Sequence, residues 1–279
     1  MKTPQSATVH MTLLLTMTLF SATLATAGQT WPAVVISDSL ENQAAPNLGP
    51  GTDPSLFGTV TKALLPLTKP TSVSNVGTDA DAYVMANGVG FASKCAAFYT
   101  GTASSGYAPN VTWEVQSGKA SATTPCISNG TFRISWEAAA AEANRKGGHF
   151  ALYSTRASDG YGGGIMFHTS FLNTGYITVD GVTSPNVPFP TYSANTPLAF
   201  ILDADFGTGT YDFRVNGVLH VKDGAFSNWT LDGTLLFDSV KFLCQSYGFL
   251  DYNKATFALD NLSMTYLPPP PACTVVMLR

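Results

Sequence analysis

Paired carboxylates are the first chemistry that this sequence could carry, because two acids flanking a glycosidic bond can hydrolyse it. Asp203 and Asp205 are two residues apart, so on a strand both side chains would point to one face. They run directly into a Gly-Thr-Gly stretch, where acidic residues ordinarily form turns. Glu114 and Glu137 are isolated, and each follows a tryptophan. The pattern favours structural or solvent-facing roles for these acids.

The residue pattern also gives little support for proton abstraction or for nucleophilic catalysis. Arg156, Tyr161 and His168 lie close together in the sequence, and His168 falls in a strand-like run. A single histidine in a strand is more often a structural residue with satisfied hydrogen bonds than a catalytic base. The sequence contains no G-x-S-x-G motif, and the glycine-rich stretch 160–164 has neither a nucleophile nor a following Lys-Ser/Thr pair. We therefore predict no catalytic residue.

The beginning of the chain indicates export. Lys2 precedes an apolar stretch over residues 11–24, which closes on Ala25-Thr26-Ala27. This is the layout of a cleaved secretory signal. The apolar stretch is shorter than the roughly 20 residues that span a bilayer. We expect residues 1–27 to be removed and the mature chain to be extracellular or at the cell surface, with no transmembrane segment.

Composition and cysteines narrow the class further. Only 11% of the residues are charged, the net charge is −4, and no basic patch occurs, so nucleic acid is an unsuitable partner. Export permits disulfides, and Cys95 with Cys126 is the favoured pair because both lie in one turn-rich region. The pairing of Cys244 and Cys273 stays open. The sequence contains neither a C-x-x-C motif nor a His/Cys cluster, so no zinc site is predicted.

Short strand-like runs separated by turn residues recur from about residue 81 onward, which is typical of an antiparallel β-sandwich or jelly roll. We predict one all-β domain over residues 28–267, followed by a proline-rich tail over 268–279. The predicted strands are Ala33–Ser37, Ala82–Ala86, Val111–Val115, Thr131–Glu137, His149–Ser154, Gly164–Thr169, Tyr176–Asp180, Leu198–Asp203, Thr210–Asn216, Val218–Lys222, Ser239–Leu243, Ala255–Leu259 and Leu262–Tyr266.

One hairpin and one helical candidate stand out. Residues 210–215 alternate strictly between polar and apolar, and Asn216-Gly217 supplies the positive φ angles of a type I′ turn. The alanine- and glutamate-rich stretch 138–144 has high helix propensity. It predicts either a short helix or an ordered loop between strands.

Three separated segments resemble the concanavalin A-like lectin/glucanase superfamily, which includes laminin G-like domains, in its secreted bacterial form. Asp38-Ser39-Leu40-Glu41 is similar to its D-S-F-E opening. Residues 203–217 are similar to its D…G-T-Y-x-x-x-V-N-G hairpin, and residues 258–263 to its closing I-D-N-V/L-S strand. The three occur in the expected order and bracket nearly the whole mature chain. The resemblance implies a jelly-roll sandwich.

The resemblance also implies a calcium ion between the first and last strands, held by carboxylates and carbonyl oxygens. Asp38, Glu41 and Asp260 are placed for it if those strands pair, and calcium takes six to eight oxygens. The alternative is that Asp260 and Asn261 only hydrogen-bond a turn.

A lectin-like function needs exposed aromatic rings that stack on sugars. The candidates lie in loops or at strand ends, namely Tyr161, Tyr176, Tyr192, Trp229 and Tyr252. The superfamily's Glu-x-Asp-x-x-Glu signature and the strand motifs of its polysaccharide lyases are absent. We therefore expect a non-enzymatic carbohydrate-binding or adhesion protein. The alternatives are a glycoside hydrolase or polysaccharide lyase with a divergent site, and a structural envelope protein.

Overall fold

Alternation of apolar and polar residues builds most of the described part of the chain as β-strands. The computed structural model describes residues 33–41, 67–68, 70–74, 80–100, 109–115, 127–143, 147–156, 164–172, 174–232, 234–244 and 255–268. The strands are β1 (Val34–Asp38), β2 (Ser72–Ser74), β3 (Ala80–Ala86), β4 (Lys94–Thr100), β5 (Asn110–Glu114), β6 (Thr131–Ala140), β7 (Gly148–Arg156), β8 (Ile165–Phe171), β9 (Ile177–Val179), β10 (Leu198–Asp205), β11 (Thr210–Val215), β12 (Val218–Ala225), β13 (Leu235–Cys244) and β14 (Ala255–Leu267). Within these described ranges there is no helix that could cross a membrane.

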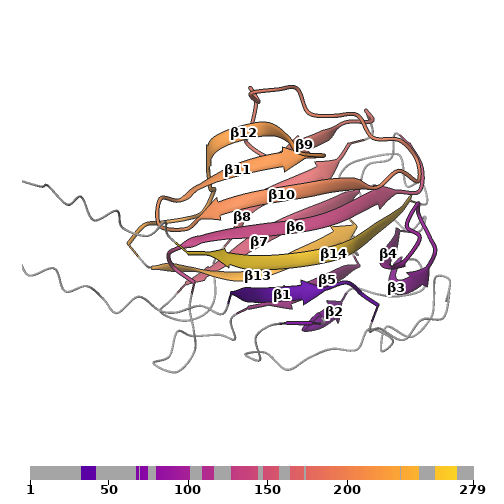
Figure 1. The fold of residues 1–279 in the computed structure, drawn as a ribbon, viewed down its shortest axis with the longest axis horizontal. Helices are drawn as coiled ribbons and strands as arrows, with labels where there is room; N and C mark the ends of the chain where they lie inside the picture. The colour runs from indigo at the N-terminus through magenta and orange to yellow at the C-terminus, as the bar shows by residue number, and fades with distance from the viewer. Residues whose placement is uncertain are drawn as a thin grey trace, which may run out of the picture. The chain divides into compact units, whose positions relative to one another are not determined.

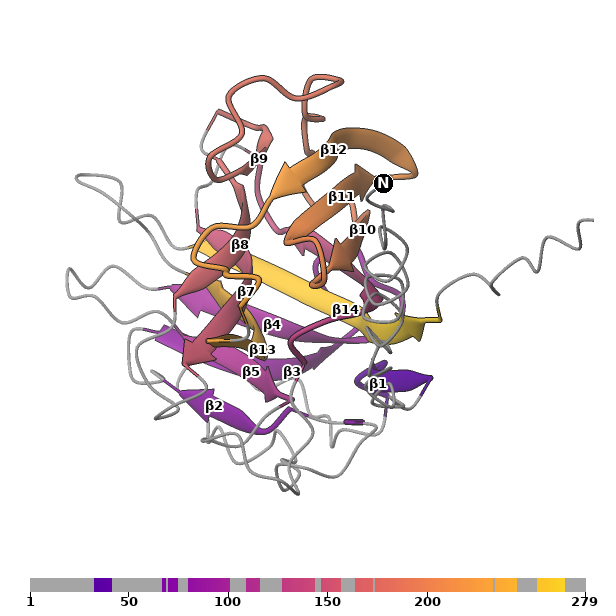
Figure 2. The same cartoon turned by 90° about the vertical axis from the view of Figure 1, so that its left-hand side faces the viewer.

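The strands form two sheets that pack face to face (Figures 1 and 2). Sheet A has eight strands in the order β12-β11-β10-β6-β14-β4-β3, with β1 paired to the second half of β14. Sheet B has six strands in the order β2-β5-β13-β7-β8-β9. All the strand pairs are antiparallel. The predicted all-β antiparallel sandwich is confirmed, and its first and last strands do pair.

The predicted hairpin is present between β11 and β12. Val215 and Val218 face each other across it, and its two turn residues have the positive φ angles of a type I′ turn, 49° at Asn216 and 79° at Gly217. The Asn216 carboxamide also accepts a hydrogen bond from the Ala199 amide of β10 at 2.9 Å, so the turn is fastened to the next strand.

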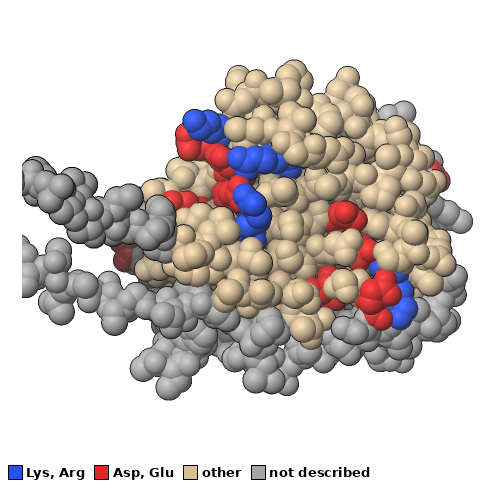
Figure 3. All heavy atoms as spheres, in the orientation of Figure 1, with Lys and Arg blue, Asp and Glu red and all other residues tan. Residues whose placement is uncertain are grey.

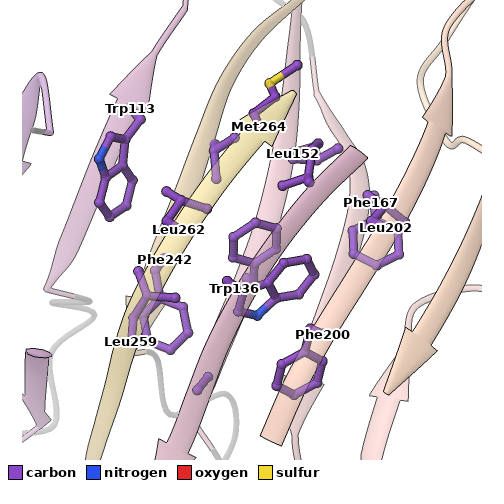
Figure 4. Close-up of a cluster of buried hydrophobic side chains, with 14 of the residues drawn as sticks. Trp113, Trp136, Leu152, Phe167, Phe200, Leu202, Phe242, Leu259, Leu262 and Met264 are labelled. Carbon is purple, nitrogen blue, oxygen red and sulfur yellow. The ribbon is translucent and has the colours of Figure 1, made fainter. Parts of the chain in front are cut away.

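Aromatic side chains join the two sheets at the centre of the core. Trp136 of sheet A stacks on Phe150 of sheet B, with ring centroids 3.6 Å apart and planes 9° apart. It also stacks on Phe200 of β10, with ring centroids 5.1 Å apart and planes 5° apart. Figure 4 shows Trp136 among side chains from both layers. All three rings are buried, so this stack fixes how β6, β7 and β10 face one another.

The alanine-rich stretch 138–144 is not a helix, and its first half is not a loop. β6 continues to Ala140, and Ala138 pairs with Leu198 of β10 on one side and with Leu259 of β14 on the other. Residues 141–143 then form a bend and turn. Hydrogen bonding to two neighbouring strands outweighs the helix propensity of alanine, which is a weak preference of a few tenths of a kcal/mol per residue.

Candidate functional site

The face of sheet B that points away from the core carries polar and titratable side chains. In β7, Phe150 and Leu152 belong to the core, so His149, Ala151 and Tyr153 point to the outer face. Residues paired directly across neighbouring strands form rows that run across this face, perpendicular to the strands. Thr112, Lys241, Ala151 and His168 form one row, and Asn110, Leu243, His149, Ser170 and Thr178 form the next.

Two histidines of this face are joined ring to ring. His149 Nδ1 lies 2.6 Å from His168 Nε2, and the ring centroids are 4.7 Å apart. His168 sits opposite Ala151, two residues along β7 from His149, so the two histidines are diagonal cross-strand neighbours. His168 Nδ1 in turn lies 2.8 Å from Asp180 Oδ2. We call the chain His149–His168–Asp180 the relay.

The order of groups along the relay assigns the ring protons. An ionised carboxylate only accepts hydrogen bonds, so His168 Nδ1 carries a proton and donates to Asp180. In the neutral ring His168 Nε2 is then an acceptor, and His149 Nδ1 donates to it. The arrangement therefore fixes the tautomer of His168 and directs Nδ1 of His149 toward it.

A tight turn holds the carboxylate of the relay. Val182 donates its amide to Val179 O at 3.2 Å, and Gly181 has a φ of 79°, the requirement at the third position of a type II turn. Asp180 occupies the second position and donates its own amide to His168 O at 2.9 Å. The turn thus places the Asp180 side chain beside the His168 ring, from which it accepts a hydrogen bond.

Burial decreases steadily along the relay. His149 is 2% exposed, the side chain of His168 is 11% exposed and the side chain of Asp180 is 68% exposed. The His149 ring is therefore buried, whereas the carboxylate at the other end of the relay stands in solvent.

A cation and an aromatic ring lie on the same face. The Lys241 ammonium is 4.6 Å from the centroid of the Tyr153 ring. Lys241 is opposite Ala151 and therefore in the row of His168, and it is a diagonal neighbour of His149. Diagonal neighbours in antiparallel sheets are separated by roughly 7–8 Å. A ring contact leaves the lysine charge in place, so this face offers a positive charge near the relay.

Of the three predicted ligand-binding aromatics that the structure describes, only Tyr176 lies on this face. Tyr176 is 49% exposed and precedes Thr178 and Asp180 by two and four residues, which places it on the outer side of the sheet edge. Its carbonyl accepts from the Leu172 amide at 2.9 Å. The ring is thus available at the border of the relay.

The other two described aromatics do not join Tyr176. Tyr192 is buried, packs edge-on against Phe171 and donates its hydroxyl to Leu172 O at 2.7 Å. Trp229 packs on Phe206 and donates its indole N–H to the Phe206 carbonyl at 3.2 Å. Tyr192 is therefore part of the core, and Trp229 is partly buried against it. Tyr161 and Tyr252 lie outside the described residues.

Of the predicted calcium ligands, Asp38 points into the core, whereas Glu41 and Asp260 lie near each other. Asp38 accepts from the Trp113 indole at 3.0 Å and from the Leu40 amide at 2.9 Å, toward the core. Asp260 accepts from Ser93 Oγ and from the Asn261 amide, both at 2.7 Å, which is the turn role that the sequence left open.

Glu41 accepts from the Lys94 amide at 3.1 Å. Across the part of the chain that the structure describes, no group of three or more His, Cys, Asp or Glu side chains could hold a metal ion.

The predicted disulfide is not found. Cys95 is a buried free thiol of β4 whose sulfur lies 3.6 Å from the Gly88 carbonyl oxygen. Its neighbours in a small apolar cluster are Val89, Phe91, Ala139 and Ala258. Cys126 lies outside the described residues.

The acidic pair of β10 has structural roles. Asp203 accepts from Arg133 Nε at 2.7 Å and from Arg214 Nη1 at 2.7 Å, so arginines occupy both of its oxygens. Asp205 accepts from the Gly207 and Thr208 amides and closes the following turn, as its sequence context predicts. Figure 3 shows the charges on the outer face of sheet A gathered in two groups with a wide uncharged area between them.

Sequence reasoning missed the relay because it weighed His168 alone. A usable signal was present: the predicted strands His149–Ser154 and Gly164–Thr169 are consecutive, and each contains one histidine. Their antiparallel pairing brings the two rings onto one face. Asp180 could not be found in this way, since its position depends on the turn after β9.

Comparisons with known proteins give structural likenesses only. No family model and no curated protein matches the chain. An alginate lyase, Aly36B, superposes with a TM-score of 0.47 at 13% identity, over 85% of this chain and 98% of that one. Alginate lyase A1-II′, of polysaccharide lyase family 7, gives 0.43 at 15% identity, over 66% and 82%. A sialidase gives 0.44 at 10% identity, and the match covers 67% of this chain but only 17% of the sialidase.

Proposed function

We propose that this chain is an exported carbohydrate-active enzyme that cleaves an acidic polysaccharide by elimination, with the relay as its acid and base. The observation that carries the proposal is the hydrogen-bonded chain from His149 through His168 to Asp180 on the outer face of sheet B. Such a chain orients two imidazole rings and a carboxylate for proton transfer, which a protein that only binds sugar does not need.

The chemistry follows from the groups on this face. In a uronic acid residue, the proton on the carbon beside the carboxylate becomes removable when the negative charge that develops is stabilised. The relay takes up that proton, and the Lys241 ammonium stabilises the carboxylate. The carbon–oxygen bond to the neighbouring sugar then breaks, a double bond forms in the ring, and the leaving oxygen takes up a proton.

Tyr176 supplies a surface for the polymer. Its exposed ring lies on the same side of sheet B as Thr178 and Asp180, at the edge of the face that carries the relay. Aromatic rings stack on sugar faces and orient them without participating in proton transfer. A chain bound across β8 and β9 could therefore rest on Tyr176 while another sugar lies beside the exposed end of the relay at Asp180.

Carboxylate-pair hydrolysis is less well supported by this structure. The pair of β10 that has the right spacing is ion-paired to Arg133 and Arg214 or closes a turn. Non-enzymatic carbohydrate binding is the second candidate, and the exposed Tyr176 ring is the observation that favours it.

The test is to incubate the secreted chain with alginate, pectate, hyaluronan and a neutral glucan, and to record the ultraviolet absorbance of unsaturated products. We expect product from at least one acidic polymer. His149→Gln should lower kcat by about 10²–10⁴-fold, the usual contribution of a general base. Lys241→Gln should reduce turnover far more than Lys222→Gln, its matched control on sheet A. Binding of a polymer without product would favour the second candidate, and product from the neutral glucan alone would contradict elimination.

A further inference from the structure

We infer that Tyr153 is a positioning residue, whose ring holds the Lys241 ammonium in place as a preformed site for one carboxylate of an acidic polysaccharide. For the class of ligand this inference rests on the proposed function. It goes beyond that function, because a lysine can attract a carboxylate without any group that orients it. The contact that carries the inference joins the Lys241 ammonium to the Tyr153 ring, whose centroid is 4.6 Å away.

Strand register brings these two side chains together. Lys241 of β13 lies opposite Ala151 of β7, so Tyr153, two residues further along β7, is its diagonal cross-strand neighbour on the same face. His168 of β8 lies opposite Ala151 from the other side. Because alanine ends in a methyl group, no long side chain of β7 stands between the lysine and the relay in this row. The ammonium and His168 therefore border the same small residue from opposite strands.

The ring holds the lysine without neutralising it. Arg133 and Arg214 on sheet A are both ion-paired to Asp203. Lys241 makes no ion pair with any residue in the part of the chain that the structure describes. An aromatic face attracts an ammonium through its quadrupole and adds no negative charge. Lys241 and Tyr153 are both half-buried, and charges in such places are screened less than charges in open solvent. The pair thus offers a positive charge for an anionic ligand.

The contribution of Tyr153 is order before binding. A lysine side chain that becomes fixed only when the ligand arrives lowers affinity by about 2–10-fold. If the ring already fixes the side chain in the free protein, this loss is reduced. Lysine presents a compact charge and no rigid fork of donors, unlike arginine. We therefore expect the site to select sugars by charge, so that different uronic acids bind and neutral sugars do not.

A double-variant cycle tests the inference on binding alone. Calorimetry gives the Kd of short alginate, pectate and hyaluronan oligosaccharides, under conditions in which ultraviolet absorbance shows no cleavage. We expect Tyr153→Leu to raise the Kd of the bound oligosaccharide by about 2–10-fold. Tyr153→Phe should stay near the wild-type value, since phenylalanine keeps the ring. Lys241→Gln should raise the Kd at least as much as Tyr153→Leu. Adding Tyr153→Leu to Lys241→Gln should change nothing further, because the ring then has no charge to hold.

Tyr266→Leu is the matched control. Tyr266 is another half-buried tyrosine, and its ring packs on Phe132 of sheet A at a centroid distance of 5.3 Å. Its loss should leave the Kd unchanged. The inference is overturned if Tyr153→Leu raises the Kd equally with and without Lys241, since the ring would then act on the sugar or on the fold. It is also overturned if Tyr153→Phe binds as poorly as Tyr153→Leu, or if none of the acidic oligosaccharides binds.

These outcomes are distinct from those of the proposed function. Binding that depends on Lys241 and Tyr153 as expected, without unsaturated product from any polymer, would support the site and contradict elimination. Unsaturated product together with independent effects of the two changes would support elimination and overturn the inference. Salt gives a further check, because screening weakens the attraction between exposed charges. The rise of the Kd with salt concentration should be smaller in Lys241→Gln than in wild type, and an equal rise would count against a charged site at Lys241.

Discussion

His168 and Asp180 are joined twice: the Asp180 amide donates to the His168 carbonyl at 2.9 Å, and the Asp180 carboxylate accepts from the His168 ring at 2.8 Å. The backbone bond closes the end of sheet B, and the side-chain bond orients a ring of the relay. One short turn therefore serves both the fold and the site, so a change in the turn should be visible in both.

Gly181→Ala tests this double role. Gly181 has a φ of 79°, and an added Cβ would meet nothing within 4 Å, so the cost is backbone strain alone. We expect a loss of about 1 kcal/mol in the free energy of unfolding, together with altered NMR signals of the His168 ring. Urea unfolding measures the first effect.

Gly217→Ala is the matched control for that change. Its φ is also 79° and its surroundings are equally open, but it lies in the β11–β12 hairpin. It should lose a similar stability and leave the His168 signals unchanged. If wild type, Gly181→Ala and Gly217→Ala all give identical His168 signals, the coupling between the turn and the His168 ring is contradicted.

The pH dependence of stability should carry a contribution from Asp260. Burial, with the nearby charges of Glu137 and Glu41, raises the pKa of Asp260 to about 6 from an ordinary 3.8, although hydrogen bonds from Ser93 and Asn261 act in the opposite direction. The folded state therefore binds this proton more tightly than the unfolded state. Its contribution should stabilise the fold progressively as the pH falls from above 6 toward 4, by on the order of 1–3 kcal/mol.

Variants isolate this contribution from other titrations. Asp260→Asn should remove it, so the difference between wild type and variant in urea unfolding should change between pH 4 and pH 7. Glu137→Gln removes a like charge and should move the window to lower pH. If the free energies of unfolding of wild type and Asp260→Asn differ by the same amount at every pH in this range, the raised pKa of Asp260 is contradicted.

The Cys95 thiol should be unreactive in the folded protein. Burial, with the charge of Asp260, raises its pKa to about 12, and thiolate is the reactive form. We expect alkylation at mildly alkaline pH to leave Cys95 unmodified until the chain is unfolded. Peptide mass mapping detects this, with the unfolded chain as control. A Cys95 peptide that is labelled only after reduction would show a disulfide and contradict the free thiol.

Local sequence patterns were sufficient for most strands and for the β11–β12 turn. Strict alternation over residues 210–215 and the Asn216-Gly217 pair specify that hairpin whatever surrounds it. β4 was missed because Lys94–Thr100 includes two consecutive alanines that carry no strand signal of their own. Those alanines are buried in the sheet between β3 and β14, so long-range pairing determines their structure.

The site was less predictable than the fold, for a physical reason. Whether an aromatic ring is exposed depends on what packs on it: Tyr176 and Tyr192 lie in similar loop sequence, but only Tyr176 faces solvent. The calcium site stays a prediction, and its premise that β1 pairs with β14 is correct. Pairing does not decide which face a carboxylate occupies, and Asp38 points inward to Trp113.

The bond between Asp38 and Trp113 should contribute a measurable coupling between the two sheets. Asp38 of β1 and Trp113 of β5 are both buried, and the indole N–H donates to the carboxylate at 3.0 Å. Trp113→Phe removes the donor and keeps most of the apolar ring, while Asp38→Asn keeps the shape and removes the charge. Each change should lower the free energy of unfolding by about 1–3 kcal/mol, the penalty of a weakened hydrogen bond to a buried polar group. Because both changes affect one bond, the loss in the double variant should be smaller than the sum of the two single losses by about 0.5–3 kcal/mol. Urea unfolding of the four proteins gives the coupling directly, and strictly additive losses would mean that this contact does not help to hold the sheets together.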